Sequence, residues 1–278
     1  MDEQYKYTYE PKLLRHTEVE RYIWGDDESG HVVDWYHRNS DKLIMSLFSL
    51  APGAKWTHSE TYKSFYDADE GYYILQGSLT FHNPETGEVQ IVNQGEALHF
   101  RRHTWHYGYN FGTEQVLILA GFAPLPPDLT DAETIGQEAP PLDPPVGGRY
   151  ELIGNWPWNM TAAKEAEEIK VLSERDWLHI IQGKRTPVRV SLFLSTDRLT
   201  MGMFTLLPGM VSDPEVHLGD EIAFVTEGKA HVFLPESRHV FDMETMDATY
   251  VPKGTSHRYI NEATEPATIV FAVAPRYR

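Results

Sequence analysis

Short runs of apolar residues, separated by turn residues, recur along the chain. Residues 71–75 and 222–226 are rich in β-branched and aromatic side chains, and a glycine follows each run closely. Residues 116–120 are continuously apolar and residues 267–272 nearly so, which is typical of strands buried on both faces. Many short strands at this spacing indicate a sandwich or a barrel, and we predict an all-β protein.

Two segments interrupt the strand pattern. Residues 123–148 contain seven of the 18 prolines, and this composition predicts a stiff, irregular connector. Residues 161–172 are rich in Ala, Glu and Lys, which predicts a surface helix packed on a barrel. Asn159 or Thr161 would cap its N-terminus.

The strand pattern occurs twice. The run from Met45 to Gly53 resembles the run from Met201 to Gly209, and about five extra residues then follow in the first copy. So many matches at fixed offsets indicate a duplication, with barrels at 1–124 (core 41–124) and 151–278 (core 197–278) and a linker at 125–150. Beyond the extra residues, the pairs with constant spacing are Glu70 and Glu221, Gly77 and Gly228, Pro84 and Pro235, His106 and His257, Asn110 and Asn261, and Pro124 and Pro275.

The amino-acid composition limits which binding partners and which cellular compartment are expected for this protein. The 278 residues include no cysteine and carry a formal net charge of −17. Without cysteine there are no disulfides, thiolate zinc sites or cysteine nucleophiles, and the negative charge disfavours nucleic acid as a partner. No apolar run reaches the roughly 18 residues of a membrane helix. The first ten residues, MDEQYKYTYE, do not form a secretory signal, so we expect a cytoplasmic protein with no membrane partner.

Four polar residues of the second copy are placed to converge. Glu215 and His217 have the same parity and would share one face of a strand, and Glu221 can meet them if the chain reverses between them. His257 arrives later, behind a turn. Two carboxylates and two imidazoles inside a barrel suit a divalent metal, because a cation compensates buried carboxylates. Oxygen ligands favour Mn(II) or Fe(II), and imidazole also admits Zn or Ni.

The spacing of these residues resembles the two signature motifs of the cupin superfamily. The first reads Gly209-(five)-Glu215-(one)-His217-(three)-Glu221-(six)-Gly228, with Glu215 where most members have a first His. The second reads Pro252-(one)-Gly254-(two)-His257-(three)-Asn261, with Met246 in place of the usual leading Gly. Residues 95–110 resemble this second motif in the first copy. The resemblance implies a bicupin: two antiparallel double-stranded β-helix (jelly-roll) barrels with one or two short helices.

The same resemblance implies metal ligands in each barrel. In the second barrel they are the four converging residues named above. In the first barrel Glu70 and His106 match, and His58 and Glu60 complete the set if the extra residues follow them. The alternative is an ungapped alignment back from Glu70. It places Ser64 and Tyr66 at the positions of Glu215 and His217, and the first barrel then has no working metal site.

Five further residues are candidates for the chemistry. Glu227 at a strand end, or Tyr259, which shares parity with His257, could move protons. Arg101 could bind a substrate carboxylate, although salt bridging is the common use of Arg in so acidic a chain. Phe224 and Tyr250 could wall the pocket, although core packing is the ordinary role of such rings.

Three classes of function remain open. A metal held by four side chains leaves two adjacent positions, where a small molecule with two neighbouring oxygens can chelate. We favour a non-haem Fe(II) or Mn dioxygenase acting on a phenolic, diol or diketone substrate, on family analogy. The alternatives are a redox-neutral lyase, isomerase or decarboxylase, and a non-enzymatic bicupin that binds a small ligand. We expect no organic cofactor, and a homodimer because bicupins commonly associate.

Overall fold

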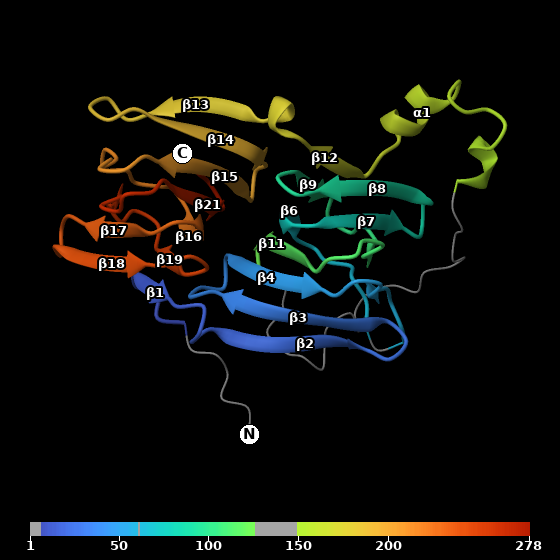
Figure 1. Ribbon diagram of the computed structural model, residues 1–278, viewed down its shortest axis with the longest axis horizontal. Coiled ribbons are helices and arrows are strands. Elements are labelled where there is room, and N and C mark those ends of the chain that lie inside the picture. Colours follow the sequence, from blue (N-terminus) through green and yellow to red (C-terminus); the bar gives the residue numbers. More distant parts are fainter. Residues whose placement is uncertain (1–6, 61, 126–148) are drawn as a thin grey trace.

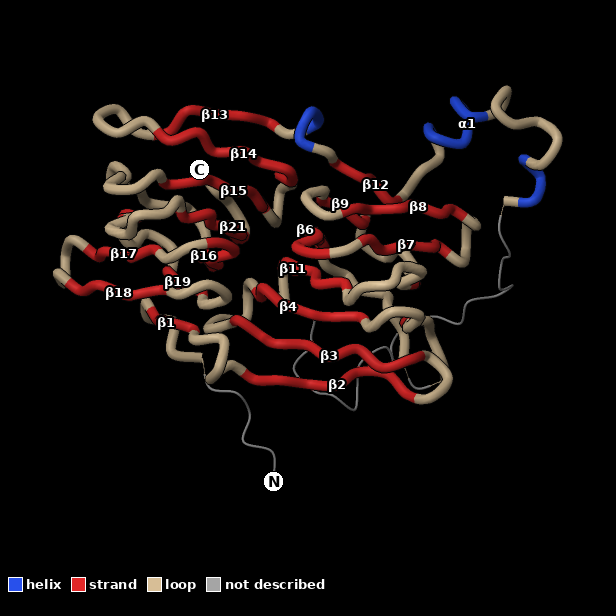
Figure 2. The backbone as a smooth tube through the Cα atoms, in the orientation of Figure 1, coloured by secondary structure: helices blue, strands red, loops and turns tan. Residues whose placement is uncertain are grey.

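The computed structural model describes residues 7–60, 62–125 and 149–278. Two β-barrels lie side by side, with the N-terminal barrel on the right and the C-terminal barrel on the left in Figure 1. Among the described residues, helix is confined to three short segments, Tyr150–Leu152 (η2), Met160–Glu165 (α1) and Glu174–Asp176 (η3) (Figure 2). The all-β prediction is confirmed. Within the described ranges, no helix has the length and apolar character needed to cross a lipid bilayer.

The N-terminal barrel is built from two antiparallel sheets that face each other. Its strands are β2 (Glu20–Asp26), β3 (Gly30–His37), β4 (Ile44–Leu50), β5 (Lys55–Trp56), β6 (Asp69–Gln76), β7 (Ser78–Asn83), β8 (Glu88–Asn93), β9 (Ala97–Phe100), β10 (Tyr107–Tyr109), β11 (Val116–Ala123) and β12 (Ile169–Leu172). The larger sheet has the order β12-β9-β6-β11-β4-β3-β2, and the smaller has the order β5-β10-β7-β8.

The C-terminal barrel repeats this plan. Its strands are β1 (Lys12–Leu14), β13 (Leu178–Gln182), β14 (Val188–Ser195), β15 (Thr200–Leu206), β16 (Asp220–Glu227), β17 (Ala230–Leu234), β18 (His239–Met243), β19 (Ala248–Val251), β20 (Arg258–Ile260) and β21 (Ala267–Ala274). The sheets have the orders β1-β19-β16-β21-β15-β14-β13 and β18-β17-β20. The strands β6, β9 and β11 correspond residue for residue to β16, β19 and β21, so the duplication inferred from spacing is present in three dimensions.

The two barrels exchange their first strands. β1 pairs with β19 of the C-terminal barrel, with Leu13 opposite Thr249. In the same way β12 pairs with β9 of the N-terminal barrel, with Val171 opposite Leu98. The predicted ranges 1–124 and 151–278 therefore place each of these strands in the wrong barrel. Strands of three or four residues carry no periodicity that could show which sheet edge they join.

The predicted helix over 161–172 is wrong in its second half. Helix α1 ends at Glu165, has no buried residue, and receives no side-chain cap from Asn159. Residues 169–172 instead form β12, because Ile169 and Val171 pack on the core of the N-terminal barrel. Pairing and burial there outweigh the helix propensity of the segment. Most of the predicted linker, residues 126–148, lies outside the described residues.

Alternation along the strands sorts the apolar side chains into three cores. On β16, Ala223 and Val225 face the interior of the C-terminal barrel. Ile222 and Phe224 face the other way, into an apolar layer between the barrels. The inner strands β11 and β21 are buried on both faces, and this is why they read as continuous apolar runs.

Candidate metal centre

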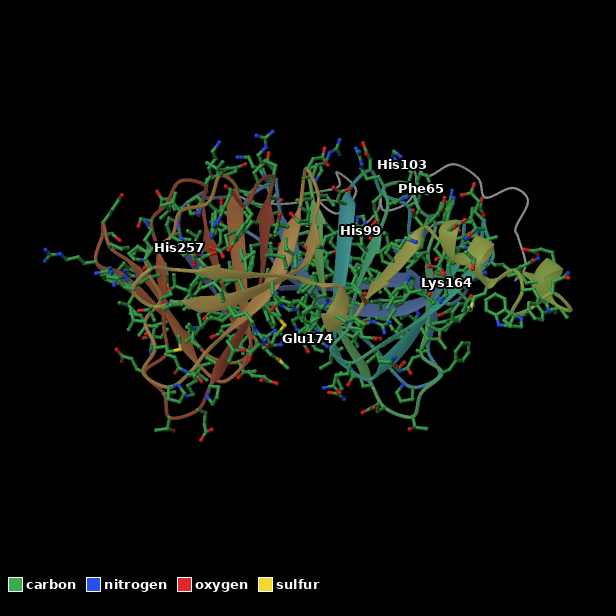
Figure 3. The ribbon with its side chains drawn as sticks, turned by 90° about the horizontal axis from the view of Figure 1, so that it is seen from above. Phe65, His99, His103, Lys164, Glu174 and His257 are labelled. Atoms are coloured by element: carbon green, nitrogen blue, oxygen red, sulfur yellow. The ribbon has the colours of Figure 1, made fainter. Side chains whose placement is uncertain are left out.

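Four side chains converge inside the C-terminal barrel. Glu215 and His217 lie on the segment between β15 and β16, Glu221 is the second residue of β16, and His257 directly precedes β20. Glu215 and His257 form an isolated backbone bridge with N–H···O distances of 2.8 and 3.1 Å. Figure 3, seen from above, shows His257 within the barrel.

The ligand atoms of these residues are close enough to contact one ion. Nε2 of His257 lies 2.8 Å from Oε2 of Glu221. Nε2 of His217 lies 3.7 Å from Oε2 of Glu221 and 3.8 Å from Oε2 of Glu215. The ligand atoms of Glu215, His217 and His257 all lie within 4.8 Å of one another. The four residues that the sequence analysis predicted to converge therefore lie together in the structure.

The main chain determines which nitrogen of each histidine faces the cluster. Nδ1 of His217 lies 3.1 Å from the carbonyl oxygen of Tyr277, and Nδ1 of His257 lies 3.1 Å from that of Thr255. A carbonyl oxygen can only accept, so Nδ1 carries the hydrogen in each case. In the neutral ring this leaves the lone pair of Nε2 directed at the carboxylates, which is the arrangement of metal-ligating histidines.

The close approach of the two buried carboxylates and the imidazoles shifts the pKa values of the cluster. Burial and the neighbouring Glu221 raise the pKa of Glu215 to about 8. Burial alone would lower the pKa of His257, but Glu221 and Glu215 outweigh it and raise that pKa to about 9. Oε2 of both carboxylates, Nε2 of His257 and the Tyr259 hydroxyl are buried without a hydrogen bond of good geometry. A divalent cation would satisfy these donor atoms, so the residues fit a metal ion.

A cavity of about 590 Å³ opens at the cluster. The ring of Tyr277 stacks on His217 with 4.6 Å between ring centroids, and its hydroxyl donates to Gln182 at 2.6 Å. Lys184 and Arg278 add positive charge to the lining. The remaining walls are largely apolar, so the cavity suits a small organic molecule; they include Val188, Val190, Phe204 and Phe271.

A comparison with protein families agrees with this geometry. The family model described as the cupin domain matches residues 46–122 and residues 202–273, one match in each barrel. The chain belongs to the cupin family. The prediction of a bicupin is thereby confirmed.

Solved bicupin structures share this fold at low sequence identity. AerE from Microcystis aeruginosa superposes with a TM-score of 0.60 at 13% identity, covering 95% of this chain and 97% of AerE. Oxalate decarboxylase from Bacillus subtilis gives a TM-score of 0.62 at 15% identity, covering 98% of this chain and 79% of that enzyme. No curated protein matches the sequence.

Two residues predicted to move protons have different locations in this cupin. Tyr259 is fully buried and lines the cavity beside Glu221. Glu227 is exposed at the other end of β16, where its carboxylate accepts a hydrogen bond from Thr268 at 3.3 Å. It lies six positions along the strand from Glu221, about 20 Å at the usual rise. The prediction for Glu227 was therefore wrong.

The three predicted substrate contacts also lie away from the cavity. Phe224 and Tyr250 are buried in the layer between the barrels, and the Tyr250 hydroxyl donates to Asp220 at 2.9 Å. Phe224 differs in parity from Glu221, and this signal in the sequence could have excluded it. Arg101 is exposed in the turn after β9 of the other barrel. All three predictions were wrong.

The N-terminal barrel has only half of the ligand set. Nε2 of His106 lies 3.6 Å from Oε2 of Glu70. The hydroxyl of Tyr72 lies 3.2 Å from that carboxylate oxygen and 3.5 Å from Nε2 of His106. This hydroxyl lies beside both groups, whereas the matching residue of β16 is the small Ala223. Ser64 and Tyr66 occupy the other two ligand positions. Both are buried, and with His106 they line a small cavity of the N-terminal barrel.

His58 and Glu60 do not complete the set in the N-terminal barrel. Glu60 is exposed, and His58 hydrogen-bonds the Tyr107 hydroxyl. The hydrogen-bond pattern favours the ungapped alignment, because the His103 N–H bonds the carbonyl of Tyr66 at 2.9 Å. The N–H of Gly254 bonds the carbonyl of His217 in the same way, at 3.1 Å. The second metal site predicted at His58, Glu60, Glu70 and His106 was therefore wrong.

Asp34 of the N-terminal barrel is a buried carboxyl group that should make stability depend on pH. Burial outweighs the hydrogen bond from Ser46 and raises its pKa from 3.8 to about 7. Between these values the folded state holds a proton that the unfolded state releases, so the free energy of unfolding falls as pH rises. Asn does not titrate, so we expect the free energy of unfolding of Asp34→Asn to rise relative to that of the unaltered protein as the pH increases. Between pH 4 and pH 8 the difference should change by roughly 4 kcal/mol. Urea unfolding of both proteins across this range measures the difference, and parallel pH profiles would contradict it.

Proposed function

We propose that this protein is a metal-dependent bicupin enzyme with its active site in the C-terminal barrel. The observation that carries the proposal is the convergence of two carboxylates and two imidazoles on one point at a cavity of about 590 Å³. Buried groups of this kind are costly unless a cation or another partner compensates them, so their convergence at a cavity indicates a functional site. The N-terminal barrel would take no part in this metal chemistry.

Glu215, His217, Glu221 and His257 would hold the metal. Fe(II) or Mn(II) suits the two carboxylates, and Zn or Ni suits the two imidazoles. Bound there, such an ion supplies Lewis-acid polarisation of a substrate oxygen. The carbonyls of Tyr277 and Thr255 orient the two imidazoles for this purpose.

The other residues of the cavity would position the substrate. The apolar walls would contact the carbon skeleton of the substrate, and Lys184 and Arg278, which share the lining with Asp213, would attract a negatively charged oxygen. Burial and the neighbouring Glu221 raise the pKa of Tyr259 well above its ordinary value, so its hydroxyl stays protonated. It can then donate a hydrogen bond, or a proton, to an oxygen of the bound molecule.

We propose a dioxygenase reaction on a small phenolic, diol or diketone substrate. Two adjacent oxygens of such a molecule match the two positions that a four-ligand site leaves open. The apolar walls suit its carbon skeleton. In this reaction both atoms of O₂ enter the product as a carbon–carbon bond breaks.

A redox-neutral decarboxylase, lyase or isomerase is the second candidate. Tyr259 supports it, because a protonated hydroxyl buried beside the ligand cluster can return a proton to carbon or oxygen after bond cleavage. Oxalate decarboxylase, a redox-neutral enzyme by name, shares the fold of this chain, but at 15% identity this likeness concerns the fold alone.

Oxygen uptake distinguishes the two reactions. We expect Fe(II)-loaded protein to consume one O₂ for each molecule of acetylacetone or catechol converted, and His257→Ala to lose at least ~100-fold of this rate. An oxygen electrode and product chromatography measure both quantities. Turnover that persists without O₂ would assign the redox-neutral class instead. A protein that binds metal but converts no member of a panel of diketones, catechols and small carboxylic acids would be a ligand-binding bicupin.

A further inference from the structure

A second cavity lies in the N-terminal barrel at the place that corresponds to the metal pocket. It encloses about 50 Å³, and His106 lies in its lining. Val32 and Phe48 line it where Val188 and Phe204 line the metal pocket. The duplication has therefore given each barrel a cavity in the same location, with different side chains around it.

Aromatic rings form most of the wall of this N-terminal cavity. Trp24 and Tyr36 lie with 5.9 Å between their ring centroids, and Phe48 contacts Trp56 at 5.6 Å and Tyr72 at 5.3 Å. All five rings are at least nine-tenths buried. The faces of aromatic rings carry negative electrostatic potential, so a cavity walled by them favours a positively charged guest.

A carboxylate in the lining has no positively charged partner there. Asp34 is buried and lines the cavity, and the Ser46 hydroxyl donates to it. Among the described residues of the lining, none is Lys or Arg. Arg38 lies behind the ring of Tyr36 and pairs with Glu20 at 2.7 Å. The corresponding position in the C-terminal barrel is the apolar Val190, so the carboxylate is particular to this cavity.

We propose that the N-terminal cavity binds a small organic cation of the methylammonium class. The Asp34 carboxylate balances the charge of the cation, and the rings around it contact the methyl and N–H groups. The volume admits only a few non-hydrogen atoms, which excludes choline and larger amines. A divalent metal is not the expected guest, because Ser64 and Tyr66 stand where the C-terminal barrel has Glu215 and His217.

Calorimetric titration with methylammonium chloride at pH 8.5 tests this proposal, because burial raises the pKa of Asp34 to about 7 and the side chain is ionised only above that pH. Sodium chloride at equal ionic strength gives the baseline, and methanol is the neutral molecule of similar size. We expect saturable binding of methylammonium to the unaltered protein and binding at least ~10-fold weaker to Asp34→Asn, since a buried charge loses its counterion. Asp41→Asn removes an exposed carboxylate of the same barrel and should bind like the unaltered protein.

A thermal unfolding series gives a second readout. Methylammonium should raise the midpoint of the unaltered protein and of His257→Ala, which separates this site from the metal centre, but not that of Asp34→Asn. Trp56→Leu should weaken binding by removing one ring. Absence of saturable binding to the unaltered protein, equal binding to Asp34→Asn, or equal binding of methanol would each overturn the proposal. Potassium ion that binds in place of methylammonium would also overturn it, because the rings would then have no role.

Discussion

Glu221→Gln should lower the affinity of the protein for Mn(II) by at least ~100-fold, because loss of a direct ligand costs more than the 10- to 100-fold that loss of an outer-shell partner costs. Glu221 is 2% exposed, and its Oε2 lies 2.8 Å from His257 and 3.7 Å from His217. Glutamine keeps the shape of the side chain but removes the charge that would balance the cation. Titration with Mn(II), followed by the paramagnetic resonance of the free ion, measures the affinity.

Glu227→Gln is the matched control for this variant. It removes the same charge from the same strand, but at an exposed position away from the cavity. Its Mn(II) affinity should equal that of the unaltered protein. In thermal unfolding, metal at about 100 times its dissociation constant should stabilise the unaltered protein and Glu227→Gln by about 2.7 kcal/mol. An equal loss of affinity in both variants would mean that only the net charge matters, and would contradict the proposed ligand role.

Phe224→Ala should lower the free energy of unfolding by about 3–5 kcal/mol. Phe224 is fully buried in the apolar layer between the barrels, and its ring meets the ring of His37 at 5.1 Å. Alanine would leave a cavity where strands from both barrels pack. Phe224→Leu fills most of that space and should cost clearly less. Urea unfolding measures both values.

The two roles considered for Phe224 give opposite results. A residue of the layer between the barrels affects stability and leaves Mn(II) affinity and the KM of any substrate unchanged in the folded protein. A pocket wall would do the reverse. Normal stability of Phe224→Ala together with a raised KM would therefore contradict the placement of this ring.

Much of the fold could be predicted from the sequence, because the duplication repeats its spacing over several strands. The exchange of β1 and β12 could not, since strands of three or four residues contain too few positions to indicate which sheet they join. The helix-forming composition of residues 161–172 was misleading for a different reason. Burial of Ile169 against the other barrel decided its conformation, and that contact is made across the fold.

The spacing shared with the cupin motifs located the four converging residues. Strand parity was not the reason, because Glu215 and His217 lie on the segment between β15 and β16 rather than on a strand. The support from Tyr277 could not be found in this way. Its main-chain carbonyl and its ring both contact His217 from 60 positions away in the chain, and no motif spacing indicates a contact of this kind. In the N-terminal barrel, spacing alone could not show on which side of His58 and Glu60 the extra residues lie. The backbone contact between His103 and Tyr66 resolves this, because it is the counterpart of the contact between Gly254 and His217.

The metal content of three matched proteins tests the central claim most directly. The unaltered protein, His106→Ala and His257→Ala would be loaded with Mn(II), desalted and assayed by plasma mass spectrometry. These two histidines are equivalents in the duplication, so the variants differ only in which barrel is altered. We predict one ion per chain in the unaltered protein and in His106→Ala, and none in His257→Ala. Retention of the ion by His257→Ala, or its loss from His106→Ala, would contradict a metal centre in the C-terminal barrel.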